Sequence, residues 1–105
     1  MRDEPSFRQF ADLDRLVHEP ARLAIMAVLY TVERADFLYL LHSTGLTKGN
    51  LSSHLMRLEE AGYVQISKTF RGKTPLTTCS LTDVGRRAFE SYRQRLRQAV
   101  DALPG

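Results

Sequence analysis

The segment GLTKGNLSSHLMRLEEAGYV, residues 45–64, carries the clearest structural signal in the chain. Thr47 is a good N-cap, because a threonine oxygen can accept a hydrogen bond from an exposed helix N–H. Gly62 is a good stop signal, because glycine tolerates the left-handed conformation that ends many helices. Leucines recur between them at helical spacing and form one apolar stripe: Leu51, Leu55 and Leu58. A helix over about 47–61 is therefore predicted.

A shorter helix is predicted immediately before it, in FLYLLHST at residues 37–44. Asp36 can cap the start of this helix, and Gly45 can end it. The two helices are then joined by a turn of about four residues that contains Gly45. Residues 36–62 therefore match a helix-turn-helix, an arrangement whose second helix enters the major groove in DNA-binding proteins.

The predicted exposed face of the second helix carries small, hydrogen-bonding and cationic groups. An α-helix turns by about 100° per residue, so most of these side chains lie away from the leucine stripe, and His54 borders it. Asparagine can pair with adenine, arginine with guanine or a phosphate, and serine with either. A glycine near the helix N-terminus allows close approach to a phosphate. The candidate DNA contacts are Thr47, Lys48, Gly49, Asn50, Ser53, His54 and Arg57.

A β-hairpin is predicted after this helix. YVQISKTF (63–70) alternates apolar side chains, RGKTP (71–75) is a turn, and LTTCSL (76–81) returns as a second strand. Cations on such a hairpin can reach the DNA backbone or the minor groove beside a recognition helix: Lys68, Arg71 and Lys73. Charges on a hairpin also protect a sheet edge from aggregation. The combination with the preceding helix, rather than the hairpin alone, therefore favours DNA.

Helices are also predicted on both sides of this unit. Residues 6–17 are amphipathic, residues 21–33 are apolar on nearly every side after Pro20, and Thr82 can cap a long helix over about 83–102. Apolar residues of the last helix recur in steps of three and four, which is typical of a helix-pairing seam. With two aromatic residues of the first helix, they are the candidate dimer contacts: Phe7, Phe10, Phe89, Tyr92, Leu96, Ala99 and Leu103. Alternatively, the two terminal helices only pack on each other.

Composition restricts the possible classes of protein. The chain has 105 residues, 43% of them hydrophobic and 26% charged, which fits one domain. Its longest apolar run, residues 23–30, is far shorter than the about 20 residues of a membrane helix. MRDEPSF at the N-terminus is not a secretory signal. We therefore expect a cytoplasmic protein that makes no membrane contact.

Charge and metal-ligand chemistry narrow these classes further. The net charge is +3, and residues 41–75 contain Lys and Arg residues against only Glu59 and Glu60. This distribution favours an anionic partner, although a solvated surface has a similar composition. Cys79 is the single cysteine, and His18, His42 and His54 lie in different elements without ligand spacing. We therefore expect no metal and no cofactor.

The motifs of residues 45–64 and 68–89 resemble those of winged-helix transcriptional regulators of the MarR/ArsR superfamily. The likeness is greatest to a small single-domain group with an HEP.R..I…L motif and LT.GNLS.HL..LE..GYV, and it covers roughly residues 12–100. It implies a homodimer that binds a pseudo-palindromic double-stranded DNA operator, usually as a repressor. It also assigns recognition-helix contacts to Lys48, Gly49, Asn50, Ser53, His54 and Arg57, and wing contacts to Lys68, Arg71 and Lys73. Metal-sensing relatives carry paired cysteines that this chain lacks.

The predicted fold is therefore mainly α with a two-stranded β-wing, a winged helix-turn-helix with N- and C-terminal dimerisation helices. We expect one domain over residues 1–105, with the helix-turn-helix at about 36–62, the wing at about 63–81 and the C-terminal dimerisation helix at about 82–102.

Two other functional classes are compatible with a chain of this size. Catalysis is disfavoured, because Ser52, Ser53 and His54 are neighbours in sequence that do not face one another on a helix. No phosphate-binding or dinucleotide-binding glycine motif is present. A winged helix that binds only another protein is the stronger alternative, although the basic helix and hairpin disfavour it. The sequence identifies neither an operator nor an effector.

Overall fold

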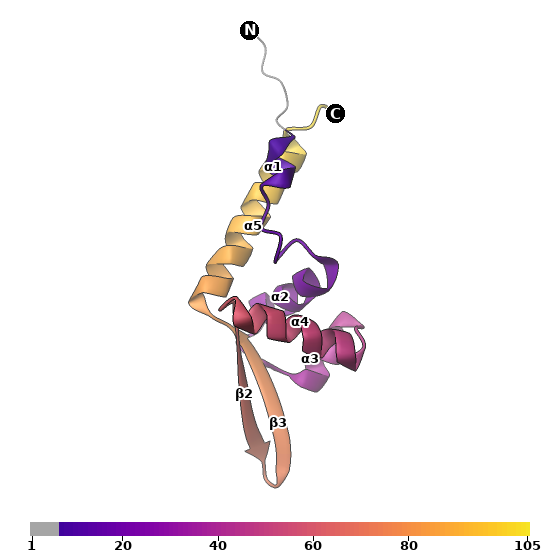
Figure 1. Cartoon of the computed structure of the whole chain (residues 1–105), viewed down its shortest axis with the longest axis vertical. Helices are drawn as coiled ribbons and strands as arrows, with labels where there is room; N and C mark the ends of the chain where they lie inside the picture. Colours follow the sequence, from indigo (N-terminus) through magenta and orange to yellow (C-terminus); the bar gives the residue numbers. More distant parts are fainter. Residues whose placement is uncertain (1–6) are drawn as a thin grey trace.

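A computed structural model describes residues 7–105 and has the predicted order of helices around one hairpin (Figure 1). The long helix rises from one end of a helical body, and the hairpin extends from the other end, so that the molecule measures 68 × 25 × 21 Å. The elements are α1 (Arg8–Ala11), α2 (Pro20–Thr31), β1 (Ala35–Asp36), α3 (Phe37–Thr44), α4 (Lys48–Glu60), β2 (Val64–Arg71), β3 (Thr74–Leu81) and α5 (Asp83–Asp101).

The core forms where α2, α3 and α4 meet. Ile25 and Leu29 of α2 are fully buried, as the nearly continuous apolar sequence of this helix predicts. Leu40 of α3 is equally buried, and α4 contributes its whole leucine stripe: Leu51, Leu55 and Leu58. Because only this stripe of α4 is buried, the opposite face of the helix is left to solvent.

The sheet has three antiparallel strands in the order β1-β3-β2. The predicted hairpin is confirmed, with β2 and β3 paired from Val64↔Leu81 to Arg71↔Thr74. Its turn is shorter than the predicted 71–75 and consists of residues 72–73, with Gly72 at φ 64°. Strand β1 was not predicted, and it pairs Ala35 with Cys79. Two residues are too few to show an alternating pattern, so the sequence could not indicate this strand. It forms because β3 provides hydrogen bonds to it. It anchors the base of the wing to the helical body.

The prediction of a helix over 6–17 is wrong for most of its length. Residue 6 lies outside the described residues, and only Arg8–Ala11 is helical. The Asp14 carboxylate accepts hydrogen bonds from the backbone N–H groups of Leu16 and Val17, at 2.9 and 3.3 Å. Aspartate side chains compete in this way with helical hydrogen bonds. The chain therefore turns, although the predicted apolar positions Leu13 and Val17 are still buried.

The start of α5 sits directly against the end of α4. The hydroxyl of Thr82 donates to the carbonyl of Gly62 at 2.5 Å, and the Thr82 N–H donates to the Tyr63 carbonyl at 3.1 Å. A Cβ on Gly85 would overlap that same Tyr63 carbonyl. Only glycine permits this close approach of two backbones. The predicted cap is confirmed, since Thr82 also accepts from the N–H of Gly85.

A hydrogen bond of 2.7 Å joins the Tyr63 hydroxyl to Asp14. Burial, followed by the bond and the negative charge of Asp14, raises the pKa of Tyr63 to about 12. An unfolded tyrosine ionises near pH 10. The folded chain therefore holds this proton more tightly, and the resulting stability is complete below about pH 10 and lost as pH rises towards 12.

The Tyr63→Phe variant is expected to lose about 1 kcal/mol of unfolding free energy at neutral pH. Between about pH 10 and about pH 12, the unfolding free energy of this variant should fall less than that of the wild type, because the titrating hydroxyl is gone. Urea unfolding across this pH range measures both effects. Tyr39→Phe is the matched control, since Tyr39 is exposed. Equal pH dependence in the two variants would contradict the role of the bond to Asp14.

Candidate nucleic-acid interface

The turn between α3 and α4 consists of residues 45–47, one fewer than predicted. Gly45 ends α3 at φ 71°, and its N–H donates to the Leu41 carbonyl. The Thr47 hydroxyl accepts from the N–H of Asn50 at 3.2 Å and so caps α4. Asp36 caps α3 in the same way, through the N–H of Tyr39. These predicted caps are confirmed, and they set the direction in which α4 leaves the turn.

The exposed face of α4 contains the candidate base-reading residues. Asn50, Ser53 and Arg57 are exposed, while the leucine stripe on the opposite side is buried. Nothing lies within 4 Å of the position that a Cβ on Gly49 would take, so the first turn is open on this side. Thr47 and Lys48 are exposed at the N-terminus of the helix. The structure therefore places six of the seven candidate residues of this helix in contact with solvent.

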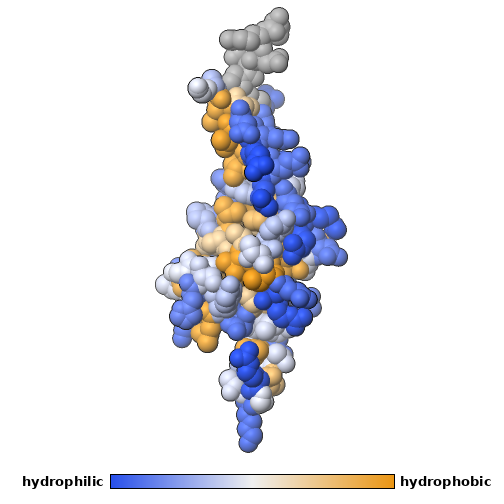
Figure 2. Space-filling view, turned by 180° about the vertical axis from the view of Figure 1, so that it is seen from behind, coloured by the Kyte–Doolittle hydropathy of each residue, from blue (hydrophilic) through white to orange (hydrophobic). Residues whose placement is uncertain are grey.

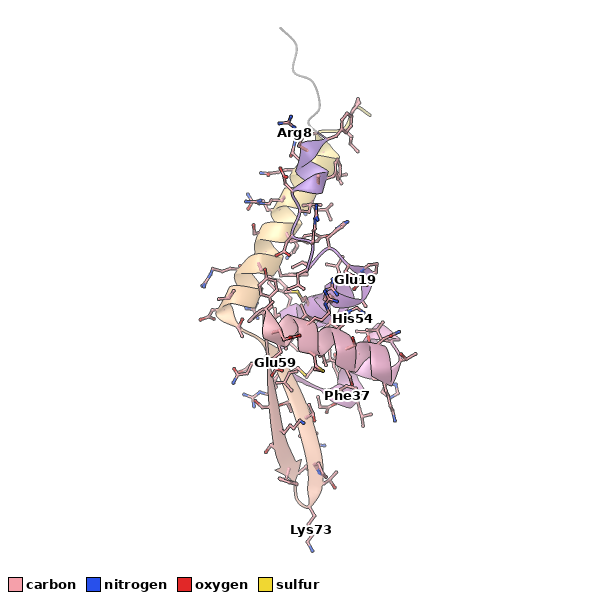
Figure 3. All side chains as sticks on the ribbon, viewed as in Figure 1. Arg8, Glu19, Phe37, His54, Glu59 and Lys73 are labelled. Carbon is pink, nitrogen blue, oxygen red and sulfur yellow. The ribbon has the colours of Figure 1, made fainter. Side chains whose placement is uncertain are left out.

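The seventh candidate, His54, is half-buried between α4 and the start of α2 (Figure 3). Its Nδ1 lies 3.2 Å from an Nη atom of Arg22 and 3.9 Å from an Oε atom of Glu19. Arg22 is only 8% exposed, and it is the one buried charged residue among residues 7–105. Neither Arg22 nor Glu19 was predicted to take part in the site. The HEP.R..I…L motif was the available signal, since it contains both residues.

The wing presents its cations at its tip and along the groove beside α4. Arg71 and Lys73 are exposed on either side of Gly72. Figure 3 shows Lys73 at the tip of the wing, and Figure 2 shows this tip as hydrophilic. Lys68 lies nearer the body. It lines a groove of about 580 Å³ between α4 and the hairpin, together with Phe37, Ser52, Leu55, Met56, Glu59, Ile66 and Thr77. Lys68 therefore faces the side of α4 that carries Ser52, Met56 and Glu59, whereas the candidate base-reading residues lie outside this groove.

The candidate dimer residues divide into two groups. Phe89 packs on Tyr30 with a ring separation of 5.0 Å, and the Tyr92 hydroxyl lies 2.5 Å from Nδ1 of His18. Phe89, Tyr92 and Ala99 are buried within a single chain.

The second group of candidate dimer residues is more exposed. Phe10 and Leu96 are half-buried, whereas Phe7 is 66% and Leu103 42% exposed. Val100, which was not predicted, is 50% exposed.

The division follows from the geometry of α5. Its first half lies against the body, and its second half projects beyond the body with α1 beside it (Figure 1). Hydrophobic side chains line one side of this projection in Figure 2. The buried members of the predicted seam therefore stabilise the fold of one chain. The exposed members lie at the far end of α1 and α5.

Two further observations concern other kinds of site. Among residues 7–105, no three His, Cys, Asp or Glu side chains are grouped as metal ligands would be. Burial, with a smaller effect of the Glu59 charge, raises the pKa of the Cys79 thiol to about 11. This cysteine is therefore protonated near neutral pH and is a poor nucleophile. No helix in the described part of the chain is long and apolar enough to cross a membrane.

A helix-turn-helix followed by a β-hairpin, with an exposed recognition helix and a basic wing, defines a winged-helix domain. Comparison with known families agrees, because the winged helix DNA-binding domain family matches residues 21–100. The chain belongs to this family. It is a DNA-binding transcriptional regulator rather than an enzyme, as the sequence predicted.

Individual relatives are consistent with this assignment. An uncharacterized protein of Methanocaldococcus jannaschii, MJ0432, is 37% identical over 78 residues, which are 74% of this chain and 85% of the relative. The solved structure of a transcriptional regulator homologue from Pyrococcus horikoshii OT3 is 28% identical. It has a TM-score of 0.87 and matches over 94% of this chain and 100% of its own. Diamide-treated YodB from B. subtilis shares the fold, with 15% identity, a TM-score of 0.77 and coverage of 87% and 89%.

Proposed function

We propose that this protein binds specific double-stranded DNA sequences as a homodimer and represses transcription. Helix α4 enters the major groove, and residues 68–75 of the wing contact the adjacent backbone or minor groove. The observation that supports this proposal is that α4 leaves a polar face exposed in a winged helix whose wing exposes the cations Lys68, Arg71 and Lys73. Repression rests on the resemblance to small winged-helix regulators.

The chemistry of α4 supports a division of roles among its side chains. Asn50 has the donor and acceptor that pair with adenine, and Arg57 has the donors that pair with guanine or a phosphate. Ser53, between them in sequence, can contact either base. Lys48 and the open first turn at Gly49 suit a phosphate, because unpaired N–H groups at a helix N-terminus attract anions.

The homodimer is supported by the exposed apolar residues at the end of the projection. Phe7, Val100 and Leu103 lie there, away from the candidate DNA surface. A two-fold dimer presents two copies of α4, and half-sites are then separated by about 34 Å, or one turn of DNA. We therefore expect a pseudo-palindromic operator.

Selection of bound duplexes from a random pool tests the proposed function directly. The expected result is one enriched motif with two-fold symmetry and half-sites centred about 10 base pairs apart. A promoter carrying this motif ahead of a reporter should lose expression when the protein is present. A pool without enrichment after repeated rounds would contradict sequence-specific binding.

One observation favours a protein-interaction module as the second candidate function. Leu38, Met56 and Phe70 are large apolar residues that are mostly exposed around α3, α4 and the wing. Such residues are more typical of a surface that contacts protein than of one that contacts phosphates. The same selection separates the two candidates, because an interaction module binds no duplex preferentially.

The variants Asn50→Ala and Arg57→Ala are expected to lose base discrimination, by about 1–3 kcal/mol for each lost base contact. Lys73→Ala should instead weaken binding by a similar factor on every sequence, because a wing cation that contacts phosphate positions the protein without reading bases. Titration of each variant against the selected operator and a scrambled duplex measures the difference. Full discrimination in both α4 variants would show that another face of the helix reads the DNA.

A further inference from the structure

The start of α2 is connected to the recognition helix α4 through one buried guanidinium. Arg22 donates from Nε to the Leu16 carbonyl at 2.6 Å and from an Nη atom to Nδ1 of His54 at 3.2 Å. Its backbone N–H donates to the Glu19 carboxylate, which caps α2, at 2.8 Å. Figure 3 shows Glu19 and His54 pointing toward each other across this junction. A residue of α2 therefore holds a side chain of the helix that is proposed to read DNA.

The contact with Arg22 determines which nitrogen of His54 carries the proton. A guanidinium has only donors, so Nδ1 of His54 must supply the lone pair. A neutral imidazole carries its one N–H on one ring nitrogen and an accepting lone pair on the other. His54 bound to Arg22 is therefore the Nε2–H tautomer.

Glu19 is the competing partner for the same nitrogen. Its carboxylate would accept a hydrogen bond and so favour a proton on Nδ1. The distance of 3.9 Å is beyond hydrogen-bond range, whereas the 3.2 Å to Arg22 is within it. The hydrogen bond from the backbone N–H of Arg22, with the nearby charge of the Arg22 guanidinium, lowers the pKa of Glu19. The carboxylate is thus charged at neutral pH, and it is the nearest acceptor if Arg22 is removed.

The other nitrogen of His54 remains available. Nε2 makes no hydrogen bond with any residue in 7–105, and no side-chain nitrogen or oxygen in this range is both buried and unpaired. Nε2 is therefore open to solvent. His54 lies four residues after Asn50 and three before Arg57, so the three side chains are neighbours on one helix surface.

We propose that Arg22 is a positioning residue, which holds His54 in the Nε2–H tautomer so that α4 presents a fixed hydrogen-bond donor to the DNA. A donor at this place selects an acceptor, such as N7 or O6 of guanine or a phosphate oxygen. This inference rests on the proposed function for its DNA partner. The arrangement of Arg22 and His54 is independent of it.

Nitrogen NMR of the histidine rings tests the tautomer in the free protein. At about pH 8.5, above the range of 5 to 8 in which imidazoles ordinarily titrate, wild-type His54 should show Nε2 protonated and Nδ1 unprotonated. The signal is assigned by its absence in His54→Asn, and the exposed His42 serves as the internal control. A proton on Nδ1 in the wild type would overturn the proposal, whatever the protein does to DNA.

The Arg22→Met variant supplies the second arm of this measurement. Methionine fills similar space and keeps the backbone N–H that Glu19 caps, but it removes the donor to Nδ1. We expect the proton of His54 to move to Nδ1, toward Glu19, and Arg22→Met/Glu19→Gln to lose that shift. An unchanged tautomer in folded Arg22→Met would overturn the positioning role. Circular dichroism shows whether Arg22→Met is folded. If it is not, Arg22→Gln replaces it, because the shorter glutamine places its N–H donor farther from Nδ1 of His54.

DNA binding is compared in two amide variants of His54. The amide of asparagine falls near the place of Nδ1 and can accept from Arg22, but it offers no donor at the place of Nε2. The longer glutamine reaches the place of Nε2 with a donor. His54→Asn should therefore lose about 5- to 150-fold. The loss is in discrimination at one base pair if the donor contacts a base, and in affinity for all duplexes if it contacts a phosphate. His54→Gln should lose less. Equal binding by His54→Asn and wild type would overturn the DNA contact.

The failures of the two proposals are distinguishable. If no duplex is bound by the wild type, the proposed function fails, while the NMR result still decides the tautomer. If duplex is bound and the tautomer is as expected, the binding losses of Arg22→Met and His54→Asn should not add in the double variant. The reason is that both substitutions remove the same donor. Additive losses would overturn the action of Arg22 through His54.

Discussion

Duplex affinity is expected to fall by about 10³- to 10⁵-fold between 50 and 200 mM salt, as for proteins that make 6–10 phosphate contacts. The physical reason is the release of counterions from DNA when cationic side chains replace them. Each protomer offers five exposed cations on α4 and the wing, and a dimer doubles that number: Lys48, Arg57, Lys68, Arg71 and Lys73. Titration of the operator at a series of salt concentrations gives the slope.

Removal of single cations shows which of them contribute to this slope. Lys73→Ala should reduce it by about 1 for each phosphate contact that is lost. Arg95→Ala is the matched control, because Arg95 is exposed on α5 at a distance from the wing. Binding that does not respond to salt, or a change of slope in Arg95→Ala equal to that in Lys73→Ala, would show that the DNA lies elsewhere.

The second large effect is expected from loss of the proposed dimer. Val100→Glu places a charge on the exposed apolar end of α5 and should shift the protein to monomer in sedimentation. Each monomer then binds one half-site alone, and operator affinity should fall by about 10²- to 10⁴-fold, the usual gain from joining two binding modules. Leu96→Glu is a less specific test, because Leu96 also packs against the core of its own chain.

Val84→Glu is the matched control for the dimer. Val84 is 51% exposed and Val100 is 50% exposed, and both lie on α5. Val84 is in the first turn, next to the body, where a negative charge is favourable to the helix. Val84→Glu should therefore remain dimeric and bind the operator normally. A wild-type protein that sediments as a monomer at micromolar concentration and still binds tightly would rule out the proposed assembly.

The limits of prediction from sequence are clearest in the terminal helices. The spacing of apolar residues in α5 indicated buried positions at Phe89, Tyr92 and Ala99, but it included the exposed Leu103 and could not indicate what covers each position. Phe89 packs on Tyr30 and Tyr92 meets His18, so these positions are used within one chain. A heptad pattern is the same for a helix that packs on its own body and for one that pairs with a partner.

The sequence by itself determined the elements whose signals are local. Thr47 and Asp36 cap the helices that follow them, Gly45 and Gly72 take positive φ in the predicted turns, and the leucine stripe fixes which face of α4 is exposed. Each of these depends on hydrogen bonds or periodicity within a few residues. They were sufficient to identify the winged helix and the candidate DNA-reading face.

Only the tertiary structure decided the features that need a partner distant in sequence. Strand β1 forms because β3 lies beside it, and the Asp14 carboxylate is held by the hydroxyl of Tyr63, 49 positions away. The contact of Arg22 with His54 joins residues 32 positions apart. No periodicity or capping rule reports such a contact, because its geometry arises from the packing of α2 against α4.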